Sequence, residues 1–185
     1  MHFNKKNIPN CITSVRIVGA VILFFVEPFS FLFYLIYSLC GVTDVLDGFA
    51  ARKLHAVSEF GSMLDSISDL LFYAAMLRHV IPYLWGNVPV GIWYYGGAVI
   101  GIRVISYLLA GIKFRRFAAL HTYGNKVSGA VVFAVPYLLL VLSDTTVCII
   151  ACTVTMLATV EEFLLHLTSG TYDPKRKTIF MHREK

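Results

Sequence analysis

Residues 44–69 read DVLDGFAARKLHAVSEFGSMLDSISD, and four aspartates in this stretch follow a helical spacing. Two sets of residues each recur along one stripe of an α-helix, at intervals of three or four positions. The first set is Asp44, Asp47, Gly48 and Ala51, and the second is Gly61, Asp65 and Asp69. A short basic segment separates the sets. The stretch therefore predicts two helices in an antiparallel hairpin that brings four carboxylates face to face.

Four carboxylates in a confined site predict bound cations, because like charges cannot all ionise close together without compensation. Carboxylate oxygens are hard ligands that suit Mg²⁺ or Mn²⁺. Two such ions would offset the four charges and leave an affinity for a diphosphate, and the small residues Gly48 and Ala51 leave room for that ligand. The alternative is that the aspartates form structural ion pairs with one or more basic residues. The candidates are Arg16, Arg52, Lys53 and Arg103.

The composition of the whole chain indicates a membrane protein. Of the 185 residues, 57% are hydrophobic and only 15% are charged. A soluble domain has about 25% charged residues, and a disordered chain has few apolar ones. The net charge is +5, but the basic residues lie between apolar runs. We therefore expect an anionic membrane face or anionic substrates as partners, and no nucleic acid.

Hydrophobic runs predict an all-α integral membrane protein built as a six-helix transmembrane bundle. A bilayer core of about 30 Å needs about 20 apolar residues per helix. The expected spans cover residues 12–26, 29–51, 61–80, 90–112, 127–142 and 146–167. They form one predicted catalytic domain over residues 1–170, followed by a basic cytoplasmic tail over 171–185. We expect the first span to be retained, because it runs into Glu27 and Pro28 without a small-x-small cleavage site.

The distribution of lysine and arginine predicts that both ends of the chain are cytoplasmic. With the N-terminus inside, nearly all the loop bases fall on the cytoplasmic side, and Arg78 alone falls outside. The outer segment between the third and fourth spans is rich in tyrosine and tryptophan, which is typical of a membrane interface. The four aspartates then lie near the cytoplasmic face.

The hairpin stretch also resembles a known family. It reads D-x2-D-G-x2-A-R-x8-G-x3-D-x3-D, which is identified as the signature of the CDP-alcohol phosphotransferase family, with every position filled. Residues 8–16 resemble the P-N-x-[IL]-T-x-x-R opening of bacterial phosphatidyltransferases. Residues 124–128, GNKVS, are similar to a G-K-x-K-T element of those enzymes but depart from it.

The resemblance implies an enzyme of phospholipid biosynthesis, a CDP-alcohol phosphatidyltransferase. It would transfer a phosphatidyl group from CDP-diacylglycerol to an alcohol and release CMP. Asp44, Asp47 and Asp65 would be metal ligands, and Asp69 would complete the two-metal site and act as general base. Gly48 and Ala51 would border the cytidine. The implied donor-binding residues are Asn10, Thr13, Gly48, Ala51, Arg52 and Gly61, and Arg16 is a further candidate beside the donor phosphates.

Arg103 indicates the acceptor, because an arginine within a span is costly and should face the bundle interior. Arginine forks suit phosphate oxygens. We predict a phosphorylated acceptor, glycerol 3-phosphate, bound by Arg103, Arg115 and Lys126. The alternatives for these bases are an ion pair between Arg103 and an aspartate, and ordinary loop charge. Glu161 and Glu162 either pair with neighbouring bases or support the acceptor pocket. The other possible acceptors are inositol phosphate, inositol, serine and phosphatidylglycerol.

Two other classes of function remain open on these residues. Intramembrane aspartates also mark ion pathways, so a divalent-cation transporter is an alternative, although the outer halves of the spans carry no matching acids. The other is a non-catalytic scaffold, which has no need of a complete signature. We expect a multi-pass protein of the bacterial cytoplasmic membrane with its active site at the cytoplasmic face. The family resemblance suggests a homodimer, and Gly97 with Gly101 forms a GxxxG packing motif.

Overall fold

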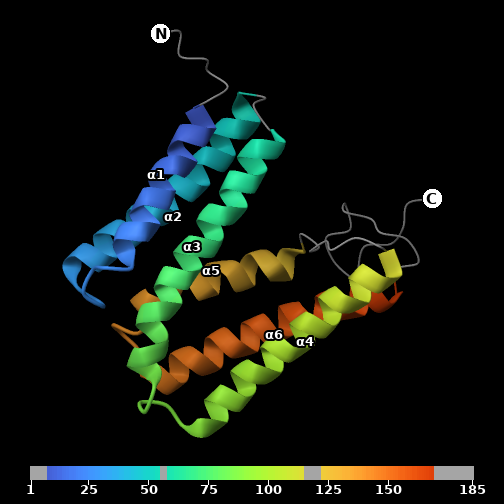
Figure 1. The fold of residues 1–185 in the computed structure, drawn as a ribbon. Coiled ribbons are helices and arrows are strands. Elements are labelled where there is room, and N and C mark those ends of the chain that lie inside the picture. The colour runs from blue at the N-terminus through green and yellow to red at the C-terminus, as the bar shows by residue number, and fades with distance from the viewer. Residues whose placement is uncertain (1–7, 55–57, 115–121, 169–185) are drawn as a thin grey trace, which may run out of the picture. The chain divides into compact units, whose positions relative to one another are not determined.

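A computed structural model describes residues 8–54, 58–114 and 122–168 of the chain, and these residues are helical with short connections (Figure 1). The described ranges contain no strand. The all-α prediction is therefore confirmed for this part of the chain. The six helices are α1 (Ile8–Leu23), α2 (Phe31–Lys53), α3 (Glu59–Leu84), α4 (Val90–Phe114), α5 (Tyr123–Leu138) and α6 (Asp144–Thr168).

Each predicted span overlaps one helix, but capping side chains place the starts of α3 and α5 earlier than predicted. Ser58 caps α3 by accepting a hydrogen bond from the backbone N–H of Gly61 at 3.0 Å. Thr122 caps α5 in the same way through Asn125, at 3.1 Å, so α5 covers 123–138 in place of the predicted 127–142. A cap satisfies backbone donors that the first turn leaves unpaired. Polar first turns therefore belong to these helices although hydropathy excludes them.

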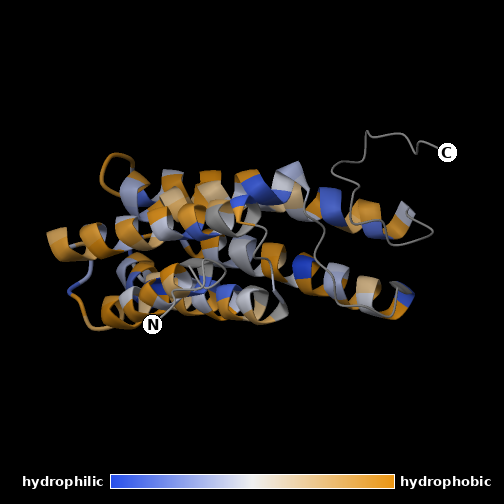
Figure 2. Ribbon diagram, turned by 90° about the horizontal axis from the view of Figure 1, so that it is seen from above, coloured by the Kyte–Doolittle hydropathy of each residue, from blue (hydrophilic) through white to orange (hydrophobic). Residues whose placement is uncertain are grey.

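Among the residues that the structure describes, three helices are long and apolar enough to cross a membrane. They are Phe31–Phe49 within α2, Val90–Lys113 within α4 and all of α6, and a shorter apolar helix covers Asn10–Leu23. Large apolar side chains such as Phe25, Phe31 and Val141 are more than 80% exposed. Apolar residues recur along the helices (Figure 2), as expected where lipid replaces water as the solvent. The chain is a helical membrane protein, and its six-span topology stays a prediction.

The first of two compact units covers residues 1–85 and contains α1, α2 and α3. Within it α1 packs against both α2 and α3. Aromatic rings fill its core: Tyr37 stacks on Phe33 and on Phe72, with ring centroids 5.5 and 4.7 Å apart. The buried ring of His79 donates from Nε2 to the carbonyl oxygen of Leu23 at 2.7 Å. This packing fixes α1 between the two helices that carry the aspartates.

The second unit covers residues 86–185, and in it α6 packs against both α4 and α5. Gly124 allows the close approach of α5 to α6, because a Cβ atom at this position would lie 3.3 Å from the Cα of Ala158 on α6. Gly97 and Gly101, the two glycines of the GxxxG motif on α4, make no such close approach to another described helix. A Cβ atom added at Gly97 or Gly101 would meet no described atom within 4 Å, so the motif makes no close contact within the described residues.

Candidate metal centre

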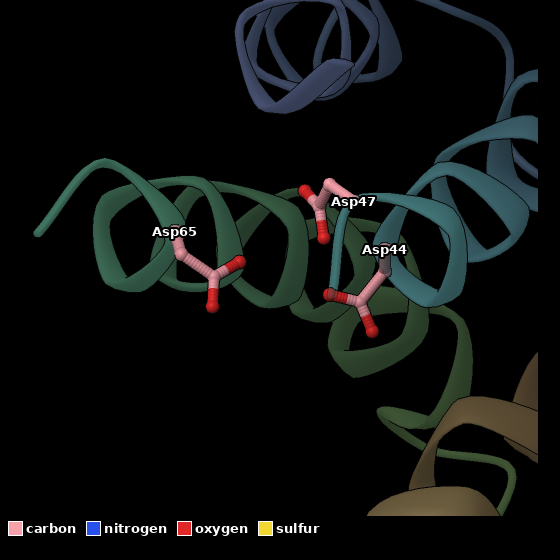
Figure 3. A group of neighbouring side chains, drawn as sticks. All are labelled: Asp44, Asp47 and Asp65. Carbon is pink, nitrogen blue, oxygen red and sulfur yellow. The ribbon is translucent and has the colours of Figure 1, made fainter. Parts of the chain in front are cut away.

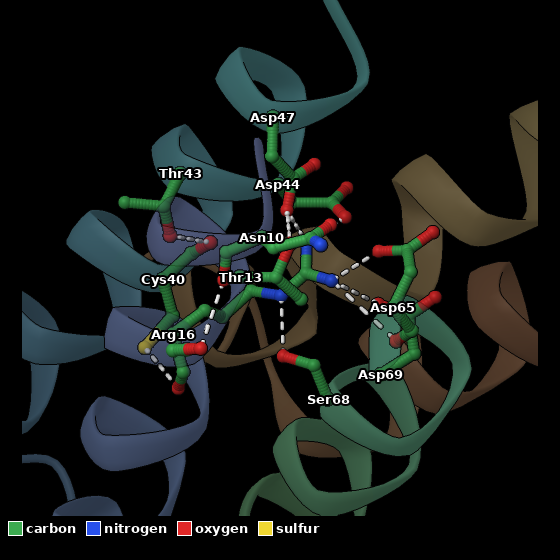
Figure 4. A network of polar contacts seen from close by, with 11 residues as sticks. Asn10, Thr13, Arg16, Cys40, Thr43, Asp44, Asp47, Asp65, Ser68 and Asp69 are labelled. Carbon is green, nitrogen blue, oxygen red and sulfur yellow. Dashed lines mark hydrogen bonds and ion pairs between the residues drawn. The ribbon is translucent and has the colours of Figure 1, made fainter. Parts of the chain in front are cut away.

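The two predicted stripes of carboxylates meet in the first unit. Asp44 and Asp47 come from α2, and Asp65 comes from α3. Each offers one oxygen, and these oxygens all lie within 4.8 Å of one another (Figure 3). One helical turn separates Asp65 from Asp69, which points into the same network (Figure 4). Carboxylates of the two stripes therefore lie close together as predicted, but α2 and α3 pack mainly against α1 and hardly against each other, so the two helices do not form a packed hairpin.

Arg16 of α1 lies at the centre of this cluster. Its guanidinium forms ion pairs with all four carboxylates (Figure 4). Nη1 contacts the aspartates of α2, Asp44 and Asp47, and Nη2 contacts those of α3, Asp65 and Asp69. The distances to Asp47 Oδ2 and Asp69 Oδ1 are 3.5 and 3.4 Å. One arginine thus links α1 to both other helices of the unit.

The Arg16 side chain is buried and tethered at a second point. Its exposure is 1%, and Nε donates to Ser68 Oγ at 2.6 Å. Nη2 also donates to the backbone carbonyl of Asp65 at 3.5 Å. The sequence pointed to Arg16 only as one possible ion-pair partner or donor contact. It gave no sign of Ser68, although this serine lies between Asp65 and Asp69 along α3.

The ion-pair alternative is therefore correct in part, because Arg16 does pair with the aspartates. It does not account for the whole charge: one guanidinium offsets one of four carboxylates and leaves three uncompensated when all are ionised. In the described part of the chain, no other basic side chain forms an ion pair with them. Asp44, Asp65 and Asp69 are about half exposed, whereas Asp47 is 6% exposed. Excess negative charge, hard oxygens and one open side fit divalent cations.

Thr13 of α1 is hydrogen-bonded to the cluster, and Asn10 of the same helix lies against the start of α3. Buried Thr13 donates from Oγ1 to Asp47 Oδ2 at 2.8 Å. Asn10 lies against Gly61 of α3, where a Cβ atom would come within 2.9 Å of Asn10 Oδ1. Glycine at position 61 therefore allows the start of α1 to approach the start of α3. Among the other predicted donor residues, Gly48 is partly exposed, and the side chains of Ala51 and Arg52 lie outside the described residues.

Arg103 occupies a separate polar cluster within the second unit. Its Nη2 donates to Asn125 Oδ1 at 2.9 Å and lies 3.9 Å from Glu162 Oε2. Nε donates to the hydroxyl of Tyr107 at 3.2 Å. Asn125 Nδ2 donates to the fully buried Glu162 carboxylate at 3.1 Å. The sequence left open an ion pair of Arg103 with an aspartate, and its acidic partner is instead Glu162 of α6.

The structure gives less information on the other two predicted acceptor residues, Lys126 and Arg115. Lys126 is exposed, and its Nζ lies 5.9 Å from the centre of the Tyr123 ring. Arg115 lies outside the described residues. Asn125 was not predicted as a site residue, although it stands where residues 124–128 depart from the G-K-x-K-T element. That departure was the available signal.

A comparison with protein families matches residues 6–164 to the CDP-alcohol phosphatidyltransferase family. The chain belongs to this family. The aspartate cluster lies within the sequence signature that resembles this family. The match covers five of the six described helices and most of the sixth. No solved structure matches the chain.

The similar curated proteins include two bacterial enzymes named CDP-diacylglycerol–glycerol-3-phosphate 3-phosphatidyltransferase. That of Wigglesworthia glossinidia brevipalpis is 38% identical over 93 residues, which cover 46% of this chain and 51% of the relative. That of Haemophilus influenzae is 35% identical over 93 residues, covering 46% and 50%. A CDP-diacylglycerol–inositol 3-phosphatidyltransferase of Rattus norvegicus is 43% identical over 63 residues, covering 34% and 30%. The chain spans about half the length of the two bacterial relatives and less of the third.

Proposed function

We propose that this protein is a metal-dependent phosphatidyltransferase of phospholipid biosynthesis, with CDP-diacylglycerol as donor and glycerol 3-phosphate as acceptor. The observation that carries the proposal is the cluster of Asp44, Asp47 and Asp65, whose oxygens lie within 4.8 Å of one another on the family signature. The names of the two bacterial relatives favour glycerol 3-phosphate. Inositol is the second candidate, because the rat relative is named for it.

Two divalent cations, Mg²⁺ or Mn²⁺, fit the carboxylates of this site. Asp44, Asp47 and Asp65 would hold them, and Asp69 would complete the set. When bound, such ions neutralise the charge that develops on CMP as it leaves. Thr13 keeps the Asp47 carboxylate in one orientation through its 2.8 Å hydrogen bond.

Asp69 is the proposed general base. Its carboxylate takes the proton of the acceptor hydroxyl, whose oxygen forms a bond to the phosphorus that carries the diacylglycerol. The bond from that phosphorus to the bridging oxygen breaks, and its electron pair leaves with CMP. Positioning of the hydroxyl supplies much of the rate, because an oriented group reacts as if it were highly concentrated. Asp69 is about half exposed, so a hydroxyl can reach it.

The substrate contacts follow the same proposal. Asn10, Thr13, Gly48, Ala51, Arg52 and Gly61 would surround the donor, and Arg103, Arg115 and Lys126 would bind the acceptor phosphate. The side chain of Arg103 is 30% exposed, and its guanidinium donates hydrogen bonds to Tyr107 and Asn125. A planar fork held in this way suits a phosphate.

The proposed location is the bacterial cytoplasmic membrane, with six spans, both ends inside and the active site at the cytoplasmic face. The concentration of Lys and Arg in the loops assigned to the cytoplasmic side supports this orientation. We also propose a homodimer, in which the open GxxxG face of α4 is available for a second copy. Cross-linking of cysteines placed at Gly97 or Gly101 in native membranes tests that contact.

The deciding experiment supplies the purified protein with radiolabelled CDP-diacylglycerol, Mg²⁺ and one acceptor at a time. We expect CMP release and a labelled lipid product with glycerol 3-phosphate, and neither in EDTA. If only inositol gave a lipid product, inositol would be the acceptor and the proposed phosphatidyl transfer would stand. The acceptors tested are glycerol 3-phosphate, inositol, inositol phosphate, serine and phosphatidylglycerol. The proposed phosphatidyltransferase activity would be refuted if no acceptor supported CMP release. Uptake of Mn²⁺ into proteoliposomes in that case would favour the transporter.

A further inference from the structure

The Arg16 guanidinium lies where a cation of the carboxylate cluster would compete with it. Each of its terminal nitrogens bridges two aspartates of one helix, Nη1 on α2 and Nη2 on α3 (Figure 4). These are the same carboxylates that fit divalent ions. Ion pairs with a guanidinium and coordination of a metal use the same oxygen atoms, so each weakens the other.

Arg16 cannot simply leave the site when metal binds. Its side chain is 1% exposed, and Nε is held by buried Ser68 at 2.6 Å. Moving an arginine out of a buried, hydrogen-bonded position leaves its partners unsatisfied. The positive charge therefore stays beside the carboxylates and repels an incoming divalent ion. The half-exposed side chains of Asp44, Asp65 and Asp69 leave the cluster accessible to that ion.

The charge balance shows what would relieve the repulsion. Four carboxylates carry −4, two divalent ions carry +4, and Arg16 adds +1, so the loaded site is net positive. A diphosphate brings at least two negative charges to the same place. Binding of metal and binding of diphosphate then favour each other, and by linkage each raises the affinity of the other by the same factor.

We propose that Arg16 is a built-in counter-ion of the carboxylate cluster, which holds the metal-free site together and weakens metal binding until a diphosphate is present. This rests on the proposed metal site and adds a positioning residue that makes tight metal binding dependent on the donor. If the role of Arg16 were purely structural, its replacement would have the opposite effect on metal affinity. Its loss would scatter the carboxylates and weaken metal binding.

The test measures Mn²⁺ binding to the purified full chain in detergent, by the electron paramagnetic resonance of free Mn²⁺, with and without CDP as the diphosphate probe. We expect CDP to tighten Mn²⁺ binding by the wild type about tenfold or more, because a unit charge near a divalent ion has at least this effect. Arg16→Gln should bind Mn²⁺ about tenfold tighter than the wild type without CDP, and should gain less from CDP than the wild type does. Arg16→Lys keeps the charge but loses the guanidinium bond to Ser68, so its Mn²⁺ affinity should lie between those of the wild type and Arg16→Gln.

The matched control is Arg78→Gln, which removes an exposed arginine of α3 and should change neither affinity. Unchanged or weaker Mn²⁺ binding in folded Arg16→Gln would overturn the inference. If that variant does not fold, Ser68→Ala decides, because it keeps every charge and removes only the tether. Tighter Mn²⁺ binding in Ser68→Ala supports the proposal, and unchanged or weaker binding contradicts it. A wild type that binds no Mn²⁺ with or without CDP would refute the metal site itself.

Discussion

Replacement of Thr13 by valine tests how the metal centre is held in shape. The change exchanges the buried hydroxyl for a methyl group and removes the 2.8 Å hydrogen bond to Asp47 Oδ2. A hydrogen bond to a charged acceptor contributes about 1.5–3 kcal/mol. Asp47 also forms an ion pair with Arg16 Nη1 at 3.5 Å, but this longer contact cannot replace the short hydrogen bond from Thr13. The metal-free protein should therefore lose about 1.5–3 kcal/mol of stability.

The same change should weaken metal binding. Groups that orient a metal ligand typically contribute about 10–100-fold to affinity, so we expect Mn²⁺ affinity to fall by at least about tenfold. Thr13→Val and Arg16→Gln thus move Mn²⁺ affinity in opposite directions, although both side chains come from α1 and contact Asp47. Mn²⁺ titration followed by electron paramagnetic resonance measures the affinity, and thermal unfolding in EDTA measures the stability.

Thr13→Ser is the matched control for this prediction. It keeps the donor and removes one buried methyl group, which costs about 0.8 kcal/mol of hydrophobic stabilisation. The serine variant should lose some stability but bind Mn²⁺ as the wild type does. Equal loss of Mn²⁺ affinity in the two variants would refute the role of the hydroxyl, as would wild-type affinity in Thr13→Val.

Three further predictions concern the base, the acceptor and the packing of the second unit. Asp69→Asn should abolish CMP release while Mn²⁺ still binds to the three other aspartates, whose oxygens lie within 4.8 Å of one another; retained turnover would remove Asp69 as the base. Arg103→Lys keeps a charge opposite Glu162 but loses the planar fork, so KM for the acceptor should rise several-fold while KM for the donor stays; equal rises would count against acceptor binding. Gly124→Ala should destabilise the protein by about 1–3 kcal/mol, as overpacking does, because its Cβ would lie 3.3 Å from the Cα of Ala158; Gly129→Ala on the same helix meets nothing within 4 Å, and chemical unfolding should show no loss of stability.

The helices themselves were largely predictable from the sequence, but their ends were not. Long apolar runs can satisfy their backbone in a membrane only as helices, so each predicted span overlaps one helix of the structure. Hydropathy marks where apolar residues begin, whereas a helix begins at its cap. Thr122 therefore starts α5 before the polar residues Gly124 and Asn125, which hydropathy assigns to a loop.

The carboxylate cluster was also predictable, because periodicity fixes which side chains share a face of one helix. Two stripes on consecutive helices can bring their carboxylates together, and oxygens of Asp44, Asp47 and Asp65 do lie close to one another. The same rule says nothing of a third helix. Which face of α1 meets the hairpin depends on packing, so the sequence could suggest that Arg16 pairs with the aspartates but not that it contacts all four.

The sequence by itself determined that this protein is a helical membrane protein with the signature of its family and four aspartates on two helical stripes. Only the tertiary structure decided what surrounds those aspartates: Arg16 between them, Thr13 on Asp47, and Ser68 on the arginine. It likewise gave Arg103 its partner in Glu162, 59 positions away along the chain. The physical reason is that spacing along one helix is set by local backbone geometry, whereas contacts between helices are set by how whole faces pack.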